Sequence, residues 1–191
     1  YTIAEDSLLI TTQENGVLSN DTDADDEHIN LSSEAVIMPS HGSLDLNHDG
    51  TFTYIPNQDF SGTDEFTYEL SDGQGGEAIA TVSIDVLGVN DAPEVANDTA
   101  FDTQGLLENG RIVGQFTASD ADEGDTFTYQ IMAEDGNNAF AIDAEGRVIV
   151  SNISQINQSV SDEVSIIIQV SDQQGVSVQA SVKISWDAIP T

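Results

Sequence analysis

One internal repeat constrains this chain more than any other feature of its sequence. Leu70-Ser71-Asp72-Gly73-Gln74-Gly75 returns as Val170-Ser171-Asp172-Gln173-Gln174-Gly175, an offset of 172 − 72 = 100 residues. Thr22-Asp23-Ala24-Asp25 returns as Ser119-Asp120-Ala121-Asp122, an offset of 120 − 23 = 97. Two offsets this similar predict a tandem duplication. We therefore expect two domains, residues 1–91 and 92–191, that meet at the stretch from Val89 to Pro93.

Each repeat contains short strand patterns with turn residues between them. In the first, residues 43–46 and 51–55 flank Asn47-His48-Asp49-Gly50, and in the second, residues 140–142 and 147–150 flank Asp143-Ala144-Glu145-Gly146. Alternating apolar residues separated by such turns are typical of a β-sandwich, and helical periodicity is nearly absent. The sequence predicts an all-β chain of two tandem Greek-key sandwiches.

The charge of the chain limits the classes of partner that it can bind. Its 35 acids and 3 bases give a formal charge of −32. Nucleic acid and anionic membrane surfaces both require Lys and Arg, so we expect neither as a partner. Many of the acids cluster, and clustered carboxylates indicate multivalent cations. There is no cysteine, which excludes disulfides and thiolate metal sites. No apolar run is long enough for a membrane span, and we interpret the chain as a piece of a longer protein.

Strand geometry gathers acids at the junction of the two domains. A strand of eight residues between Asp64 and Asp72 separates them by roughly 26 Å, so they occupy opposite ends of domain one. The next strand returns the chain to the end that holds Asp64. By the same reasoning, the Asp172 hairpin lies at the linker-facing end of domain two. We expect a strand from Ile112 to Ala118, and the Asp120–Asp122 loop that follows it shares this end. The acids and amides expected at this junction are Glu5, Asp64, Asn90, Asp91, Asp120, Asp122 and Asp172.

Such a cluster needs a counter-charge, because adjacent carboxylates at low dielectric repel one another by several kcal/mol. Three basic residues in the whole chain cannot supply it. A hard cation with six to eight oxygen ligands can, and this description fits Ca²⁺ better than Mg²⁺ or Zn²⁺.

Both domains carry sets of short motifs. Those of domain one are Gly16-Val17-Leu18-Ser19-Asn20-Asp21-Thr22-Asp23-Ala24-Asp25, His41-Gly42-Ser43-Leu44, Asp49-Gly50-Thr51-Phe52-Thr53-Tyr54, Phe60-Ser61-Gly62-Thr63-Asp64 and Val89-Asn90-Asp91-Ala92-Pro93. Those of domain two are Leu107-Glu108-Asn109, Thr117-Ala118-Ser119-Asp120-Ala121-Asp122, Phe140-Ala141-Ile142-Asp143 and Val170-Ser171-Asp172. Through these motifs the chain resembles the tandem cadherin-like repeats of large bacterial surface adhesins of the RTX type. Domain one resembles the bacterial variety, and domain two is closer to a cadherin repeat proper.

The resemblance implies seven-stranded sandwiches with calcium between successive repeats. Asp120, Asp122 and Asp172 match upper-end ligands, Asn90 and Asp91 match linker ligands, and Glu5 matches the base glutamate. Two departures suggest fewer ions than a cadherin junction holds. Gly88 stands where a linker acid is usual, and the acidic pair before the penultimate strand has Asp64 as its nearest counterpart, with Asp162 doubtful in domain two.

The outer ends of both domains also carry acids. Asp21, Asp23, Asp25 and Asp72 form either a cluster that serves a preceding repeat or an acidic loop in solvent. Glu108 and Asp187 mark the far end of domain two in the same way. The three histidines lie in separate loops without ligand spacing, and no Ser-His-Asp arrangement or cofactor motif is present. We therefore expect no enzyme.

These observations lead to one functional hypothesis and one alternative. We expect a calcium-dependent adhesin segment, extracellular or on the bacterial surface, in which junction calcium stiffens tandem repeats for cell adhesion or biofilm attachment. Its partners would be adjacent repeats of the same long chain, and the fragment itself would be monomeric. The alternative is a calcium-assisted module that binds polysaccharide or a like repeat.

Overall fold

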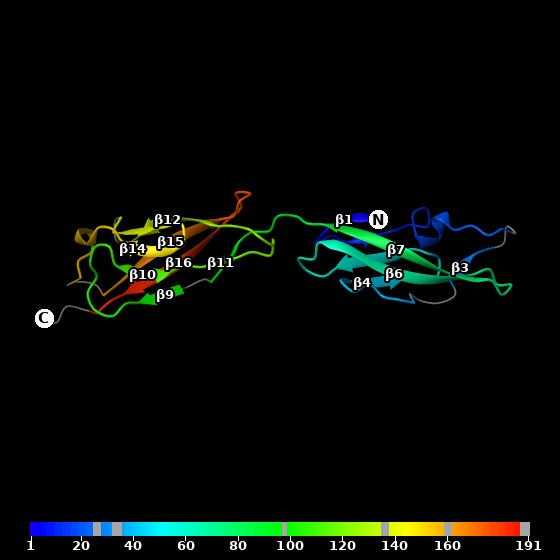
Figure 1. Cartoon of the computed structure of the whole chain (residues 1–191), viewed down its shortest axis with the longest axis horizontal. Helices are drawn as coiled ribbons and strands as arrows, with labels where there is room; N and C mark the ends of the chain where they lie inside the picture. The colour runs from blue at the N-terminus through cyan, green and yellow to red at the C-terminus, as the bar shows by residue number, and fades with distance from the viewer. Residues whose placement is uncertain (25–27, 32–35, 97–98, 135–137, 159–161, 188–191) are drawn as a thin grey trace. The chain divides into compact units, whose positions relative to one another are not determined.

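A computed structural model describes residues 1–24, 28–31, 36–96, 99–134, 138–158 and 162–187 (Figure 1). The chain forms two compact units, Tyr1–Val89 and Asn90–Thr191. The division precedes the predicted domain boundary by 91 − 89 = 2 residues, because Asn90 and Asp91 form hydrogen bonds with unit 2 that are described below. Among the described residues, no helix has the length and apolar character needed to cross a membrane.

Unit 1 is a sandwich of a four-stranded and a three-stranded sheet. The first has the order β1-β7-β6-β3 and the second the order β2-β5-β4. Their bounds are β1 Thr2–Ala4, β2 Leu9–Ile10, β3 Asn30–Leu31, β4 Gly42–Leu46, β5 Phe52–Pro56, β6 Gly62–Ser71 and β7 Glu77–Leu87. A short 3-10 helix, η1, spans Val17–Asn20. The core between the sheets includes the fully buried rings of Phe52, Tyr54 and Phe66.

Unit 2 repeats this plan, with order β12-β15-β16-β9 in one sheet and β10-β14-β13 in the other. A separate pair, β11-β8, lies near its start. The bounds are β8 Glu94–Val95, β9 Thr99–Asp102, β10 Ile112–Gln115, β11 Ala118–Ser119, β12 Thr128–Glu134, β13 Phe140–Ile142, β14 Arg147–Val150, β15 Glu163–Ser171 and β16 Ser177–Ser185, with the 3-10 helix η2 at Ile153–Gln155. The predicted all-β class with two sandwiches is therefore confirmed.

Alternation of buried apolar and exposed residues explains the long strands that lead to the acidic turns. In β15, Val164, Ile166, Ile168 and Val170 are buried, while the residues between them face outward. β6 alternates in the same way around Phe66 and Tyr68. This period of two fixes the register of each hairpin, because a slip by one residue would turn every apolar side chain outward.

One predicted strand is divided in the structure. The sequence predicts a strand from Ile112 to Ala118, but β10 ends at Gln115 and β11 begins at Ala118. Between them Phe116 is buried, and its backbone N–H donates to Gly146 O at 2.8 Å. The chain thus leaves β14 at Phe116 and pairs with β8, which carries Asp120 and its loop to one end of unit 2.

Candidate metal-binding site

Three carboxylates meet in the loop between β11 and β12 of unit 2. Asp120, Asp122 and Asp125 each offer an oxygen within 4.8 Å of the others. The backbone N–H of Asp122 donates to Asp120 Oδ1 at 3.1 Å, which turns the loop so that both side chains lie on the same side. The sequence predicted Asp120 and Asp122 but missed Asp125. Its signal was available, because Asp125 follows Asp122 by one short turn around Gly124.

Asp172 lies in the β15–β16 turn and is only 5% exposed. Its Oδ1 accepts a hydrogen bond from Val176 N–H at 2.8 Å, and its Oδ2 accepts one from Asn90 Nδ2 at 2.8 Å. Burial raises the pKa of this carboxyl, but the bonds from Asn90 and the turn outweigh burial and hold the pKa below its usual value. Asp172 is therefore ionised at neutral pH.

Asn90 and Asp91, the first residues of unit 2, form hydrogen bonds with the same group of acids. Asn90 Nδ2 reaches both Asp172 and the carbonyl oxygen of Asp91, the latter at 2.8 Å. The backbone N–H of Asp91 donates to Asp122 Oδ2 at 2.9 Å. The structure thus brings together the predicted residues Asn90, Asp91, Asp120, Asp122 and Asp172 within one unit.

Several oxygens of this cluster lack a hydrogen-bond donor. Within the described part of the chain, Asn90 Oδ1, Asp120 Oδ2 and Asp125 Oδ2 are buried atoms without a partner. The pKa of Asp125 is raised by burial and by the charges of Asp120, Asp122 and Asp172. A buried oxygen without a donor is costly, and repelling neighbours add to that cost.

The basic side chains of the chain bond elsewhere. Arg111 donates to the carbonyl oxygens of Leu106 and Gln104. Arg147 pairs with Asp143 at 2.7 Å, and Lys183 pairs with Glu163 at 2.7 Å. The donor set of the cluster is therefore carboxylate and amide oxygen without a paired cation, which fits a hard divalent ion such as Ca²⁺.

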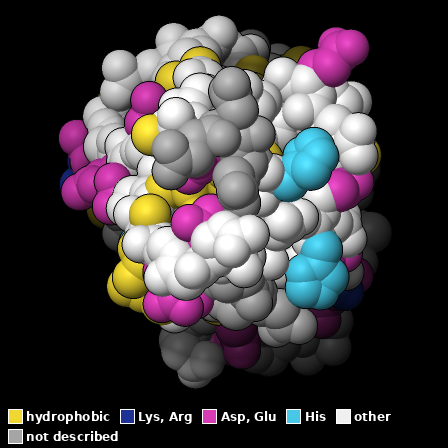
Figure 2. All heavy atoms as spheres, turned by 90° about the vertical axis from the view of Figure 1, so that its right-hand side faces the viewer, with side chains coloured by type: hydrophobic (Ala, Val, Ile, Leu, Met, Phe, Trp, Pro, Cys, Tyr) yellow, Lys and Arg dark blue, Asp and Glu magenta, His cyan; other side chains and the backbone are white. Residues whose placement is uncertain are grey.

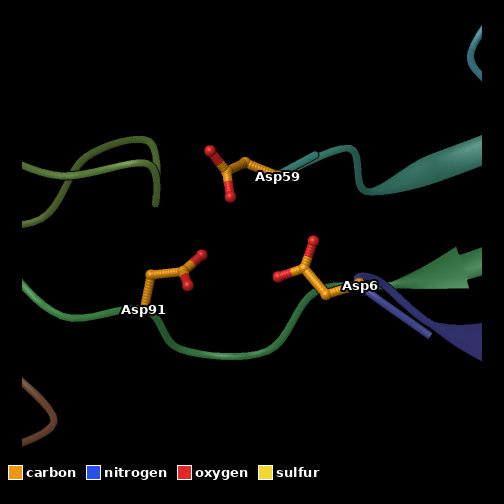
Figure 3. A group of neighbouring side chains, drawn as sticks. All are labelled: Asp6, Asp59 and Asp91. Atoms are coloured by element: carbon orange, nitrogen blue, oxygen red, sulfur yellow. The ribbon is translucent and has the colours of Figure 1, made fainter. Parts of the chain in front are cut away.

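Unit 1 holds three further acids in two of its loops. Glu5 is 6% exposed, and its Oε1 accepts a hydrogen bond from the backbone N–H of Val89, the last residue of the unit. Asp6 and Asp59 each offer an oxygen within 4.8 Å of the other, and both side chains are labelled in Figure 3. Both residues have a φ of 56°, in the left-handed region that Asp tolerates better than most residues. The sequence predicted Glu5 but missed Asp6 and Asp59.

Asp64 has a different environment from the one predicted for a ligand. It is 2% exposed and accepts hydrogen bonds from Tyr54 Oη at 2.8 Å, from the backbone N–H groups of His41, Ser40 and Glu65 at 2.9 to 3.0 Å, and from Ser40 Oγ at 3.3 Å. These donors satisfy both carboxylate oxygens without a metal ion. The contacts describe a residue that fixes the chain before β4, and its predicted role as a ligand stays a prediction.

The other end of unit 1 holds the predicted acids in a more open setting. Asp21 accepts a hydrogen bond from Tyr68 Oη at 2.9 Å, and Asp72 accepts bonds from the N–H groups of Gln74 and Gly76 in its own turn. A cavity of about 200 Å³ is lined by residues that include Asp23 and Asp72. Figure 2 shows acidic and histidine side chains on this end. Asp25 lies outside the described residues.

The two acids predicted at the far end of unit 2 differ in their contacts. Asp187 Oδ2 accepts a hydrogen bond from Gly105 N–H at 2.6 Å, which ties the end of the unit to the turn after β9. Glu108 is exposed, and its carbonyl oxygen accepts a bond from Arg111 N–H. Neither belongs to a group of neighbouring ligand atoms among the described residues.

Comparison with protein families assigns both units. Residues 1–88 match the model of the bacterial cadherin-like domain, and residues 90–185 match that of the bacterial Ig domain. One curated relative is Integrin beta-like protein B of Dictyostelium discoideum, which is 27% identical over 157 residues. That match covers 73% of this chain and 8% of the relative.

Solved structures with the same fold include cadherins. Human protocadherin-24 EC1-2 is 15% identical, with a TM-score of 0.63, over 100% of this chain and 94% of that one. Drosophila N-cadherin EC1-4 is 18% identical, with a TM-score of 0.60, over 87% of this chain and 42% of that one. At these identities the likeness shows the fold alone.

Proposed function

We propose that this chain, which belongs to the bacterial cadherin-like domain family over residues 1–88 and to the bacterial Ig domain family over residues 90–185, is a calcium-binding spacer of an extracellular adhesin. Both families and the cadherin-like fold support an adhesion-type extracellular module. The calcium dependence and a role in cell-surface or biofilm attachment belong to our proposal.

One observation carries the calcium proposal: buried oxygens in unit 2 gather without donors. Asn90 Oδ1, Asp120 Oδ2 and Asp125 Oδ2 are left without a partner among the described residues, and Asp122 lies in the same group of ligand atoms. A cation would satisfy all of them at once. Calcium accepts six to eight oxygens in flexible geometry, whereas Mg²⁺ demands a near-octahedral set and retains water.

The proposed ligands start from unit 2 and extend to unit 1. In unit 2 they are Asn90, Asp91, Asp120, Asp122, Asp125 and Asp172. In unit 1 we keep the predicted Glu5, whose carboxylate accepts a hydrogen bond from the residue that precedes Asn90 in the chain. Asp6 and Asp59 form a pair of acids within unit 1. Asp64 is the other residue of unit 1 that the sequence predicted as a ligand, and it stays in the proposed set. Its oxygens already accept hydrogen bonds, so it contributes least to our proposal.

The proposed consequence is mechanical. Without calcium, Asn90 and Asp91 connect two acidic bodies, and repulsion between carboxylates favours a loose linker. Calcium bound to the cluster would fix these residues and stiffen the passage from one repeat to the next. Because calcium would bind the folded form alone, it would stabilise that form by about 2.7 kcal/mol at a hundredfold excess over Kd.

Calcium titration calorimetry on the 191-residue chain tests this proposal. Asp122→Asn removes one charge from the cluster, and Glu123→Gln removes one charge from the adjacent exposed position. We expect calcium to bind the wild type and Glu123→Gln with similar affinity, and to bind Asp122→Asn at least about a hundredfold more weakly, or about 2.7 kcal/mol. Equal isotherms for the two variants, or no binding to the wild type, would contradict the site.

Small-angle X-ray scattering tests the mechanical step separately. We expect calcium to narrow the range of shapes of the wild type, and to leave Asp122→Asn unchanged at the same calcium concentration. If calcium binds by calorimetry but the scattering curve does not change, the site stands and the spacer mechanism is wrong.

A further inference from the structure

The outer face of the β15–β16 hairpin is unusual for so acidic a chain. Its outward positions alternate with the buried residues of both strands. They are Glu163, Ser165, Ile167, Gln169, Ser171, Ser177, Gln179, Ser181, Lys183 and Ser185, and we call them the neutral face. One Lys and one Glu give this face a net charge of zero, and they pair with each other at 2.7 Å.

The equivalent face of unit 1 is strongly acidic. The 100-residue offset maps the neutral face onto outward positions of β6 and β7 with the same strand register, as Gln169↔Gln179 and Glu69↔Ile79 illustrate. The acids there are Glu65, Glu69, Glu77 and Asp85, without a Lys or Arg, which gives a net charge of −4. Shared backbone pairing therefore does not account for the neutral face.

Its side chains can both donate and accept hydrogen bonds. Gln169 pairs with Gln130 of β12 on one side and with Gln179 on the other, where Gln179 Nε2 donates to Gln169 Oε1 at 3.1 Å. Beside this row of amides, Met132 is 49% exposed and Ile167 is 38% exposed. Amides and hydroxyls are self-complementary, because each carries donors and acceptors.

We propose that the neutral face binds the neutral face of a second copy of this chain. A chain with a charge of −32 repels its copies over most of its surface, so contact between copies is least costly where charge is absent. A basic partner would instead bind the acidic faces. The face has no aromatic side chain among its ten positions, so it lacks the stacking platform that a sugar ring would use.

The size of the face sets the strength of this contact. Two strands of nine residues, about 4.8 Å apart and rising roughly 3.3 Å per residue, cover about 300 Å². A stable interface buries about 800 Å² per partner. The pairing is therefore weak for two isolated chains and becomes effective where many copies are held side by side, because linked contacts act together.

Sedimentation equilibrium at high protein concentration tests the pairing, with matched glutamates at equivalent positions. Ser181→Glu places a charge in the middle of the neutral face, and Thr81→Glu places one at the equivalent exposed position of unit 1. We expect the wild type and Thr81→Glu to self-associate equally, and Ser181→Glu to associate at least about tenfold more weakly. Added NaCl should strengthen association of the wild type, because it screens the repulsion between copies.

Disulfide cross-linking locates the contact, since the chain has no cysteine. Gln179→Cys should give oxidised dimers and Ile79→Cys should give few, although both positions are outward and equivalent. No association of the wild type, equal weakening by both glutamates, or equal cross-linking by both cysteines would overturn the proposal. The pairing should persist in Asp122→Asn without calcium, so its failure and failure of the calcium site are distinguishable.

Discussion

The β6–β7 hairpin of unit 1 and the β15–β16 hairpin of unit 2 have the same strand pairing and different chemistry. Phe66↔Val82 and Ile166↔Val182 are paired at a constant offset of 100 residues, and so are the positions around them. At the start of the hairpin, however, Asp64 stands in unit 1 where Val164 stands in unit 2, and both are buried. The comparison teaches that alternation fixes the register, while single inward positions can change from apolar to ionised when the neighbouring loop supplies donors.

Replacement of Asp64 by the valine that unit 2 has at this position should have the largest effect on stability. In Asp64→Val, the N–H groups of Ser40 and His41 and the hydroxyl of Tyr54 lose their acceptor. We expect a loss of about 3 to 5 kcal/mol in the free energy of unfolding of unit 1, because buried donors are left unpaired. Differential scanning calorimetry of the whole chain measures it. Glu65→Val, at the exposed neighbouring position, should change stability by less than about 0.5 kcal/mol, and equal losses would refute the role of Asp64.

A fall in pH should reduce the difference in stability between the wild type and a variant that lacks the charge of Asp64. Burial raises the pKa of Asp64, but hydrogen bonds from Tyr54, His41, Ser40 and Glu65 outweigh burial and hold the pKa below its usual value. The stabilisation is therefore present above the unfolded-state pKa and is lost as the pH falls through the lower folded-state value.

Urea unfolding of the wild type and Asp64→Asn between pH 7 and pH 2 measures this effect. We expect a constant gap above about pH 5, which then shrinks by at most about 1.4 kcal/mol per pH unit. A gap that widens in acid would mean that Asp64 is protonated in the folded unit at neutral pH.

The two hairpin turns should also differ in calcium binding. Asp172 is buried and accepts a hydrogen bond from Asn90, whereas the carboxylate of Asp72 accepts hydrogen bonds from Gln74 and Gly76 of its own turn. Under our proposal Asp172→Asn weakens calcium binding at least about tenfold, or about 1.4 kcal/mol, and Asp72→Asn leaves it unchanged. Calorimetric titration of both variants distinguishes them. Weakening by Asp72→Asn alone would place the stronger site at the other end of unit 1.

Much of this fold could be predicted because its signals are local. The alternation in β6 and β15 and the turns at Asn47–Gly50 and Asp143–Gly146 each lie within a few residues, and the repeat then fixed the architecture. The break between β10 and β11 at Phe116 could not be predicted in this way, since it depends on how the buried Phe116 ring packs in the folded unit.

The candidate site was only partly predictable for the same physical reason. Asp120 and Asp122 were predicted from spacing, but spacing does not say whether a carboxylate meets donors or other carboxylates. Asp64 therefore looked like a ligand until the N–H groups of Ser40 and His41 were placed beside it. Asp6 and Asp59 are more than fifty residues apart, and only the folded unit brings their oxygens within 4.8 Å.

The smallest expected effect on stability concerns the β13–β14 hairpin of unit 2 and its counterpart in unit 1, the β4–β5 hairpin. Arg147 Nε lies 2.7 Å from Asp143 in the β13–β14 turn, whereas the β4–β5 turn of unit 1 uses Asp49 and Thr51 without an ion pair. Because the Arg147 pair is partly exposed, we expect Arg147→Gln to cost unit 2 only about 0.5 kcal/mol, and less at high salt. Thermal unfolding in low and high NaCl measures this cost. A loss above about 2 kcal/mol that persists in salt would show that the pair, rather than Gly146 and the strand pairing, holds the turn.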